Sequence, residues 1–269
     1  MESNLSNERK EYIKNTQRRK RAITLTRIGI FLITVTAWEA LARIGIIDGF
    51  VMSMPSRILK TVVSAASNGL FLHIGVTLYE TMIGFVLGVV FGGIIAAALW
   101  SSEFLSKAVE PYLVALNSLP KIALGPVIII WVGAGTKAII VMALAISMIV
   151  TTLEMLNGFR CTEAEKIMMA KTFGARKWEI FLKIVLPSNV FTLFNSLKIN
   201  IGLSLVGVIA GEFLVSKAGL GYLIVYGGQV FKMDLVMASV IILSVVAMLI
   251  YKGITFFEKL VLNNIGKAQ

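Results

Sequence analysis

Residues 162–187 read TEAEKIMMAKTFGARKWEIFLKIVLP, and this polar stretch decides the fold because long apolar runs flank it on both sides. Thr162 followed by Glu165 predicts a capping-box start to a first short helix. Gly174 is expected to end that helix, since glycine accepts the left-handed conformation found after a helix C-terminus. Pro187 is expected to end a second short helix, because residues before a proline avoid the helical region. That second helix is indicated by apolar residues at helical spacing, namely Trp178, Phe181, Leu182 and Val185.

The composition places these two helices in a membrane protein. Hydrophobic residues make up 57% of the chain, charged residues 15%, and the mean hydropathy is +0.84, far above the values of an ordinary soluble domain. We expect an all-α integral membrane protein with about six transmembrane helices, at roughly residues 28–47, 76–100, 110–135, 137–157, 191–214 and 235–251. The polar stretch then belongs to a loop, residues 158–189, between the fourth and fifth of these helices.

The net charge of +11 does not indicate a nucleic-acid partner, because the basic residues cluster at the ends of the apolar runs, where they orient a membrane protein. With the N-terminus in the cytoplasm, the cytoplasmic side collects Arg9, Lys10, Lys14, Arg18, Arg19, Lys20, Arg21, Arg27, Lys107, Arg160, Lys166, Lys171, Arg176, Lys177, Lys183, Lys252, Lys259 and Lys267. The outer side receives only Arg57, Lys60, Lys137, Lys217 and Lys232. We therefore predict cytoplasmic N- and C-termini: a disordered basic tail at residues 1–27 near anionic lipid heads, a transmembrane domain at 28–256 and a second tail at 257–269.

Polar residues inside two of the apolar runs indicate a path through the protein. Residues 110–135 contain three prolines, which predict a broken helix lining an interior. The polar groups of that segment placed nearest a path are Asn117, Ser118 and Lys121. In the run 191–214 the polar residues placed toward the interior are Asn195, Asn200 and Ser204, the last two sharing one helix face with Lys198 well round from it. Helix kinking and packing explain each single residue equally well.

Three further patterns predict packing. Glu39 and Arg43 lie four apart in the first apolar run and are expected to form a structural ion pair. Residues 48–74 are predicted to form an outer loop with an interfacial helix. A stripe of small residues, expected to let helices approach closely, consists of Gly84, Gly88, Gly92 and Gly93.

No pattern in the sequence predicts catalysis. The segment Gly133–Lys137 has glycines and a lysine but not the GxxxxGK[ST] spacing of a phosphate-binding loop, so we do not expect the chain to hydrolyse ATP. Cys161 is the only cysteine and His73 the only histidine, which excludes a disulfide framework and a histidine-rich metal site. We predict a protein that is not an enzyme and binds no metal.

The spacing from Ala170 to Gly174 and on to Ile184, Leu186 and Pro187 resembles the EAA loop of ABC importer permeases, in the branch handling nitrate, sulfonates and taurine. The Gly174–Pro187 half fits the family pattern completely. In the Glu-Ala-Ala half, the three positions are Met168, Met169 and Ala170, so only the last alanine matches. A second resemblance is a glutamate followed by a Gly-Leu-Gly turn, here Glu212 with Gly219, Leu220 and Gly221.

The resemblance implies a type I importer permease fold in the cell membrane. The EAA loop would form a coupling helix docked on a cytoplasmic ABC ATPase, with Gly174 setting the helix angle and Trp178 and Phe181 as contacts. Glu212 would border the translocation path. The implied assembly contains two permease subunits, expected as a homodimer, two ATPase subunits that bind the ATP, and an extracytoplasmic solute-binding protein, all in contact with membrane lipid. This chain would then carry no cofactor of its own, and the solute remains open among sulfonates, nitrate, taurine and pyrimidine vitamin precursors.

Two alternatives are compatible with the sequence. One is the transmembrane component of an energy-coupling-factor vitamin importer, which the Gly174–Pro187 spacing disfavours. The other is a membrane-embedded enzyme or an ion-coupled secondary transporter using Glu39, Glu80 or Glu212. An ion-coupled carrier is expected to show inverted-repeat halves, and the sequence shows no clear repeat.

Overall fold

The computed structural model describes residues 7–265, with side chains from residue 12 to residue 263, and every regular element within that range is a helix. Five of the helices are long and apolar enough to cross a membrane: α1 (Asn7–Ile44), α3 (Leu70–Ser101), α6 (Thr136–Arg160), α10 (Val190–Val215) and α12 (Met233–Ile265). Helix α4 (Glu103–Ser118) and the helices η1 (Lys121–Leu124) and α5 (Gly125–Val132) meet at a bend of 85°, and they make a sixth crossing if the bent pair forms one span. The all-α membrane fold and the break predicted in the third apolar run, residues 110–135, are thus confirmed.

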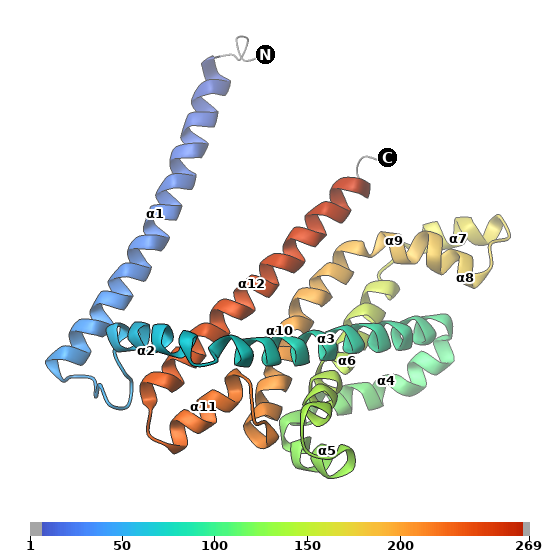
Figure 1. Ribbon diagram of the computed structural model, residues 1–269. Coiled ribbons are helices and arrows are strands. Elements are labelled where there is room, and N and C mark those ends of the chain that lie inside the picture. The colour runs from blue at the N-terminus through green and yellow to red at the C-terminus, as the bar shows by residue number, and fades with distance from the viewer. Residues whose placement is uncertain (1–6, 266–269) are drawn as a thin grey trace.

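The centre of the fold is the packing of α3 and α10 on the two sides of α6 (Figure 1). The predicted glycine stripe forms the α3–α6 contact. A Cβ added at Gly84 would lie 2.6 Å from the Ala143 Cβ, and one at Gly92 would lie 2.7 Å from the Thr151 Cβ. Gly88 faces Ser147 still more closely. The two helix backbones therefore approach to a distance that no side chain at these positions would permit.

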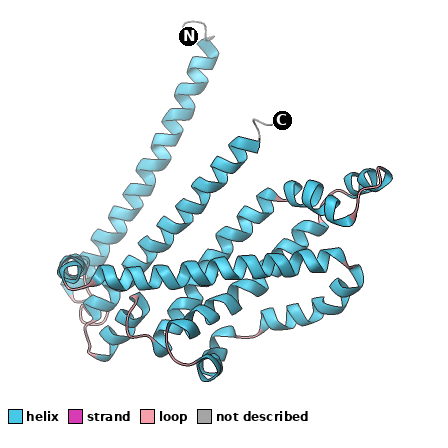
Figure 2. Cartoon of the chain, turned by 45° about the vertical axis from the view of Figure 1, so that its right-hand side comes forward, coloured by secondary structure: helices cyan, strands magenta, loops and turns pink. Residues whose placement is uncertain are grey.

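Helix α1 stands apart from the rest of the molecule in both views (Figures 1 and 2). Its most apolar stretch is almost entirely exposed, as expected of a helix surrounded by lipid. The prediction of a disordered tail before residue 28 is wrong for residues 7–27, which continue the same helix. Residues 1–6 lie outside the described range. The continuation has a physical reason: the segment contains good helix formers and neither glycine nor proline.

Helix α12 likewise runs past the predicted end of its apolar run. The sequence predicts a helix to residue 251 and a tail from residue 257, whereas α12 continues to Ile265. The predicted cytoplasmic tail therefore starts as a continuation of α12 over residues 257–265, and residues 266–269 lie outside the described range.

The predicted ion pair of α1 is confirmed and also holds a second helix. The Arg43 Nε lies 2.7 Å from the Glu39 Oε1. The same carboxylate accepts hydrogen bonds from the backbone N–H and the hydroxyl of Ser56, at 3.1 and 2.9 Å, in the first turn of α2 (Pro55–Ser67). The predicted helix in the 48–74 segment therefore exists and is attached to α1 through Glu39.

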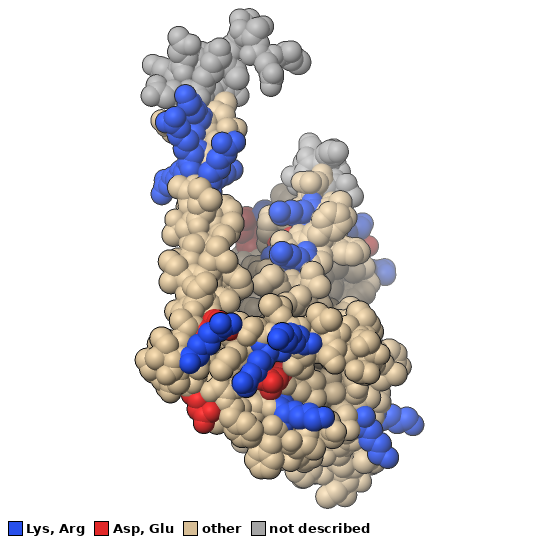
Figure 3. Space-filling view, turned by 60° about the vertical axis from the view of Figure 1, so that its left-hand side comes forward, with Lys and Arg blue, Asp and Glu red and all other residues tan. Residues whose placement is uncertain are grey.

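Both described ends of the chain point to one side of the molecule, together with the short helices of residues 164–188 (Figure 1). Basic side chains gather on the projecting part of α1 on that side (Figure 3), including Lys14 and the run Arg18–Arg21. The common side of the two termini and the polar loop agrees with the topology predicted from the positive-inside rule.

Candidate functional site

The first helix of the polar loop is α7 (Ala164–Thr172), and a glycine closes it as predicted. Gly174 has φ +76°, in the left-handed region. The Gly174 N–H donates to the Lys171 carbonyl at 2.9 Å, and the Ala175 N–H donates to the Ala170 carbonyl at 3.1 Å. These two bonds make a Schellman motif, so Gly174 sets the direction in which the chain leaves α7.

The predicted capping box at the start of α7 is wrong. The residue that precedes the helix is Glu163, and no side chain caps it. The hydroxyl of Thr162 is engaged elsewhere, because it accepts a hydrogen bond from the Asn189 amide at 2.8 Å. One of the two hydrogen bonds of a capping box is found at the next helix instead. There the Glu179 carboxylate accepts from the backbone N–H of Arg176 at 2.8 Å.

The second helix of the loop is longer than predicted, because Pro187 does not end it. Helix α8 (Lys177–Ile180) passes through a π-helical turn, η2 (Phe181–Val185), into α9 (Leu186–Ser188), and the break before α10 falls at Asn189. Pro187 stands in the first turn of α9, where its missing N–H costs little. The wider π turn before it changes the local hydrogen-bond pattern, and so the helical path continues.

Phe181 anchors the loop to the membrane bundle. Its side chain is only 5% exposed, and its ring centroid lies 5.2 Å from those of Trp100 and Phe159, at the ends of α3 and α6. The bundle thus covers Phe181, and of the two predicted ATPase contacts only Trp178 lies exposed in this structure. Lys177 adds a polar attachment, donating to the Ser101 carbonyl at 3.2 Å.

The outward side of the loop carries exposed apolar side chains, and the Trp178 ring reaches from it to stack on that of Phe181, with ring centroids 5.5 Å apart. Phe173 is 84% exposed and Trp178 63%. Met168 and Met169 are exposed beside them, whereas Ala170 is buried against the bundle. We call Met168, Met169, Phe173 and Trp178 the coupling face. Large apolar side chains held outward by a packed loop mark a surface for another protein. No sequence pattern indicates a role for Phe173, because this residue lies between the two helices of the loop.

The predicted path residues fall into separate places. Asn117, Ser118 and Lys121 lie together where α4 bends into η1, and the Lys121 ammonium donates to the Asn117 carbonyl at 2.8 Å and to its side-chain oxygen at 3.2 Å. Asn195 is exposed on α10. The structure therefore does not bring all the predicted path residues to one lining.

Asn200 and Ser204 share one face of α10, as predicted, and both are fully buried. The Asn200 amide donates to the Ser196 carbonyl at 2.9 Å and lies 3.4 Å from the Glu154 Oε2 on α6. Within the described residues, the Asn200 side-chain oxygen and the Ser204 hydroxyl have no hydrogen-bond partner. The interior placement is confirmed, and in this conformation the face is closed by α6.

Glu212 is buried and holds a turn. Its carboxylate accepts hydrogen bonds from the Thr77 hydroxyl at 2.6 Å and the Gly221 N–H at 2.5 Å. The Thr77 hydroxyl also accepts from the Leu220 N–H, at 2.8 Å. These groups surround the start of α11 (Leu220–Gln229), where a carboxylate satisfies free N–H groups and suits the helix dipole. The glycine turn predicted here is confirmed by the φ of +121° at Gly219.

An apolar groove of about 600 Å³ opens between the bent segment and α10. Its lining includes Ile122 and Pro126 from the bend, Val206, Ile209 and Phe213 from α10, and Leu243 from α12. Sequence reasoning missed this groove because its members come from three distant segments and none is polar. Lys121 and Asn117 lie at the bend that forms one of its walls.

A family described as "Binding-protein-dependent transport system inner membrane component" matches residues 88–265. Among individual proteins, the chain is 29% identical over 227 residues to a probable ABC transporter permease of Haemophilus influenzae, covering 84% of this chain and 91% of the relative. It is 27% identical to a formylaminopyrimidine transport permease of Halalkalibacterium halodurans, covering 86% and 92% of the two chains. It is 23% identical to a taurine transport system permease of Escherichia coli, covering 93% and 92%.

The fold is also found in solved structures. A chain of the MetNI methionine ABC transporter, solved in inward-facing conformations, superposes with a TM-score of 0.63 at 21% identity, over 73% of this chain and 95% of the other. A chain of a bacterial ABC transporter that imports alginate superposes with a TM-score of 0.62 at 16% identity, over 91% and 98%. These likenesses show a shared helical architecture.

Proposed function

The chain belongs to the family of binding-protein-dependent transport system inner membrane components, and from this premise we propose that residues 162–189 are its ATPase-coupling segment. The protein is the multi-pass, membrane-spanning permease subunit of an ABC importer, a transport subunit of the inner membrane. The observation that carries the proposal is the coupling face: a row of exposed apolar side chains on a loop whose other face is packed into the bundle through Phe181.

The coupling segment is suited to transmit force because it is fixed at both ends. Phe181 joins the ends of α3 and α6, and the Asn189 amide joins the start of α10 to Thr162. A load applied to the coupling face by an ATPase therefore reaches α3, α6 and α10 together. A rigid displacement of these packed helices is the type of motion expected when an importer alternates between two openings.

The partners follow from this role. An ABC ATPase binds the coupling face and supplies ATP hydrolysis, so no cofactor is needed in this chain. An extracytoplasmic solute-binding protein delivers the solute, and a second copy of the chain completes the permease pair. The solute is a small molecule of the range that the names of the relatives cover, which includes formylaminopyrimidine and taurine. Asn117, Ser118 and Lys121 lie at an exposed bend and are the proposed polar contacts on its path.

The test is co-purification of the full chain with a co-expressed ABC ATPase from membranes in which insertion of each variant has been verified. Wild type is expected to retain the ATPase, and Trp178→Ala combined with Phe173→Ser is expected to lose it. Gly174→Pro is also expected to lose it, because proline fixes φ near −65° where the chain needs +76°. Gly202→Ala is the matched control, because an added Cβ there meets nothing within 4 Å.

An ATPase that binds the coupling-face variant as tightly as wild type would overturn the assignment of the segment. The family membership favours the importer over an ion-coupled carrier. Transport in vesicles that contain this chain and no ATPase would be the result that restores the ion-coupled alternative.

A further inference from the structure

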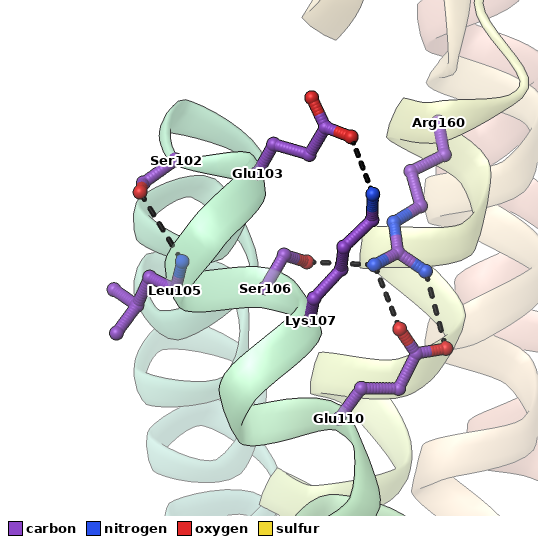
Figure 4. A network of polar contacts seen from close by, with 7 residues as sticks. All are labelled: Ser102, Glu103, Leu105, Ser106, Lys107, Glu110 and Arg160. Atoms are coloured by element: carbon purple, nitrogen blue, oxygen red, sulfur yellow. Dashed lines mark hydrogen bonds and ion pairs between the residues drawn. The ribbon is translucent and has the colours of Figure 1, made fainter.

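A network of polar side chains joins α4 to the last residue of α6, immediately before the coupling segment (Figure 4). The Arg160 guanidinium binds the Glu110 carboxylate through both nitrogens, at 3.2 and 2.8 Å. One of those nitrogens also donates to the Ser106 hydroxyl at 2.7 Å. A guanidinium that makes two parallel bonds to a carboxylate fixes orientation as well as distance.

This network is the main polar attachment of α4. Only two residues of α4 are buried, Ser106 and Leu113, and Ser106 is the residue that Arg160 contacts. Large apolar side chains elsewhere on α4, such as Phe104 and Tyr112, are exposed. With so few other contacts, the position of α4 relative to the bundle depends strongly on the bonds from Arg160.

The two ends of the network lead to different parts of the molecule. Arg160 ends α6 and is followed directly by the coupling segment, while Phe159 packs on the anchor Phe181 with ring centroids 5.2 Å apart. Glu110 lies in α4, which leads to the 85° bend with Asn117 and Lys121 and to one wall of the apolar groove. A movement of the coupling segment thus has a direct polar connection to the bend.

We propose that Arg160 and Glu110 form the positioning pair that transmits displacement of the coupling segment to the bent α4–α5 crossing. The pair does not contact solute or ATP. When the coupling segment moves, Arg160 moves with α6 and carries α4 through Glu110 and Ser106. This inference rests on the proposed function, because it assumes that an ATPase drives the coupling segment.

A hollow of about 410 Å³ beside the pair supports a connection that can move. It is lined by Leu99, Trp100, Glu103, Ser106, Lys107, Glu110 and Arg160. Tightly packed helices resist displacement, whereas the space here allows the guanidinium and carboxylate to shift together without repacking a core. The side chains of Arg160 and Glu110 are 40% and 43% exposed, so water can solvate both as they move.

The same helix offers a matched control. Glu103 and Lys107 form an ion pair with a distance of 2.7 Å, and both belong to α4, at side-chain exposures of 82% and 73%. Breaking this pair removes the same kind of interaction from the same helix without disconnecting α4 from α6. A pair within one exposed helix contributes little to stability.

The experiment measures how ATP changes the reactivity of single thiols in the reconstituted permease–ATPase complex. Cys161→Ser removes the native exposed thiol, and Ser118→Cys or Thr172→Cys then reports on the bend or on the coupling segment; Thr172 is exposed in that segment and lies outside the coupling face. Each reporter is treated with a small thiol reagent, with and without ATP and vanadate, in the Arg160→Met, Glu110→Gln, Arg160→Lys and Glu103→Gln backgrounds.

When Arg160 and Glu110 are both unaltered, we expect ATP and vanadate to change the rate at which each reporter thiol reacts. In Arg160→Met and Glu110→Gln the change at position 118 should shrink by about 2- to 30-fold, the usual range for loss of one coupling contact, while the change at position 172 persists. Glu103→Gln should leave both responses intact. Arg160→Lys keeps the charge without the paired bonds and should be intermediate, and Arg160→Glu with Glu110→Arg should restore the response at position 118.

Two results would overturn the inference. One is an unaltered response at position 118 in Arg160→Met. The other is a complex with the unaltered Arg160–Glu110 pair that responds at position 172 but not at position 118, which would mean that α4 does not follow the coupling segment. Failure of the proposed function looks different, because no ATPase would then assemble with the wild-type chain and neither reporter would respond.

Discussion

The Lys198 ammonium lies 2.6 Å from the Glu258 carboxylate and joins α10 to α12, with side-chain exposures of only 16% and 12%. Lys198 therefore does not face the closed α3–α6–α10 contact, in agreement with its predicted position well round from Asn200. The pair lets the charges of Lys198 and Glu258 neutralise each other, whereas each helix alone would have to place an unpaired charge between membrane helices.

Replacing one partner of the Lys198–Glu258 pair should lower the stability of the protein more than replacing both partners. Lys198→Met is expected to destabilise the detergent-solubilised protein by about 3 kcal/mol, because it leaves the Glu258 carboxylate buried without a partner. The double variant Lys198→Met with Glu258→Leu should recover most of that loss. Thermal unfolding of wild type, the single variant and the double variant in one detergent measures the difference, and equal losses in the single and double variants would contradict this expectation.

Replacing different glycines of α3 by alanine should affect stability differently, depending on whether the added methyl group meets α6. Gly92→Ala places a Cβ 2.7 Å from the Thr151 Cβ and should destabilise the protein by about 1–3 kcal/mol through overpacking of the α3–α6 contact. Gly75→Ala, in the same helix, meets nothing within 4 Å and should be neutral or slightly stabilising, since alanine favours helix. The yield of monodisperse protein and its unfolding temperature compare the two, and similar values would argue against the close approach.

The glycine stripe illustrates what the sequence can predict. Four-residue spacing of small residues in one apolar run indicates a close helix contact, and the stripe does form one. The sequence does not indicate which helix lies opposite, because Ala143, Ser147 and Thr151 are ordinary residues of another apolar run. The left-handed Gly174 was predictable for a similar reason, since a local backbone rule determines it.

Side-chain contacts between segments that are distant in the sequence could not be predicted from local sequence patterns. Arg160 ends α6 and Glu110 lies in the middle of α4, and no sequence spacing connects the two residues. Phe181 follows the helical pattern of Trp178, so the sequence treats both as one face, yet Trp178 is exposed and Phe181 is packed between Trp100 and Phe159. The two rings do lie on one side of the helix, stacked with centroids 5.5 Å apart. A 3.6-residue period does not show that the ends of α3 and α6 cover Phe181 and leave Trp178 exposed.

That difference predicts separate consequences for the two aromatic residues. Phe181→Ala should destabilise the protein by about 3–5 kcal/mol, because it empties a buried aromatic site. Trp178→Ala should change stability by less than about 1 kcal/mol and instead weaken the binding of the ATPase. Unfolding in detergent and ATPase co-purification, measured on the same preparations, separate the effects. A Trp178 variant as unstable as the Phe181 variant would show that Trp178 also belongs to the anchor.

Glu212 makes the start of α11 the most informative place to test a buried carboxylate. Glu212→Gln keeps the size of the side chain but replaces one acceptor oxygen with an NH₂ group, so either the Thr77 hydroxyl or the Gly221 N–H loses its acceptor. A buried donor left unpaired costs about 1–3 kcal/mol. The loss should be local, because these bonds hold the turn at 219–221 and not the central helix contact. Hydrogen exchange should therefore accelerate in the first turn of α11 and remain slow in the middle of α6. Ser244→Ala is the control, since that exposed hydroxyl bonds only the Val240 carbonyl of its own helix. If exchange in the first turn of α11 were unchanged in Glu212→Gln, the carboxylate would not be what holds the turn, and its burial would then need another explanation, such as a contact made only when the path is open.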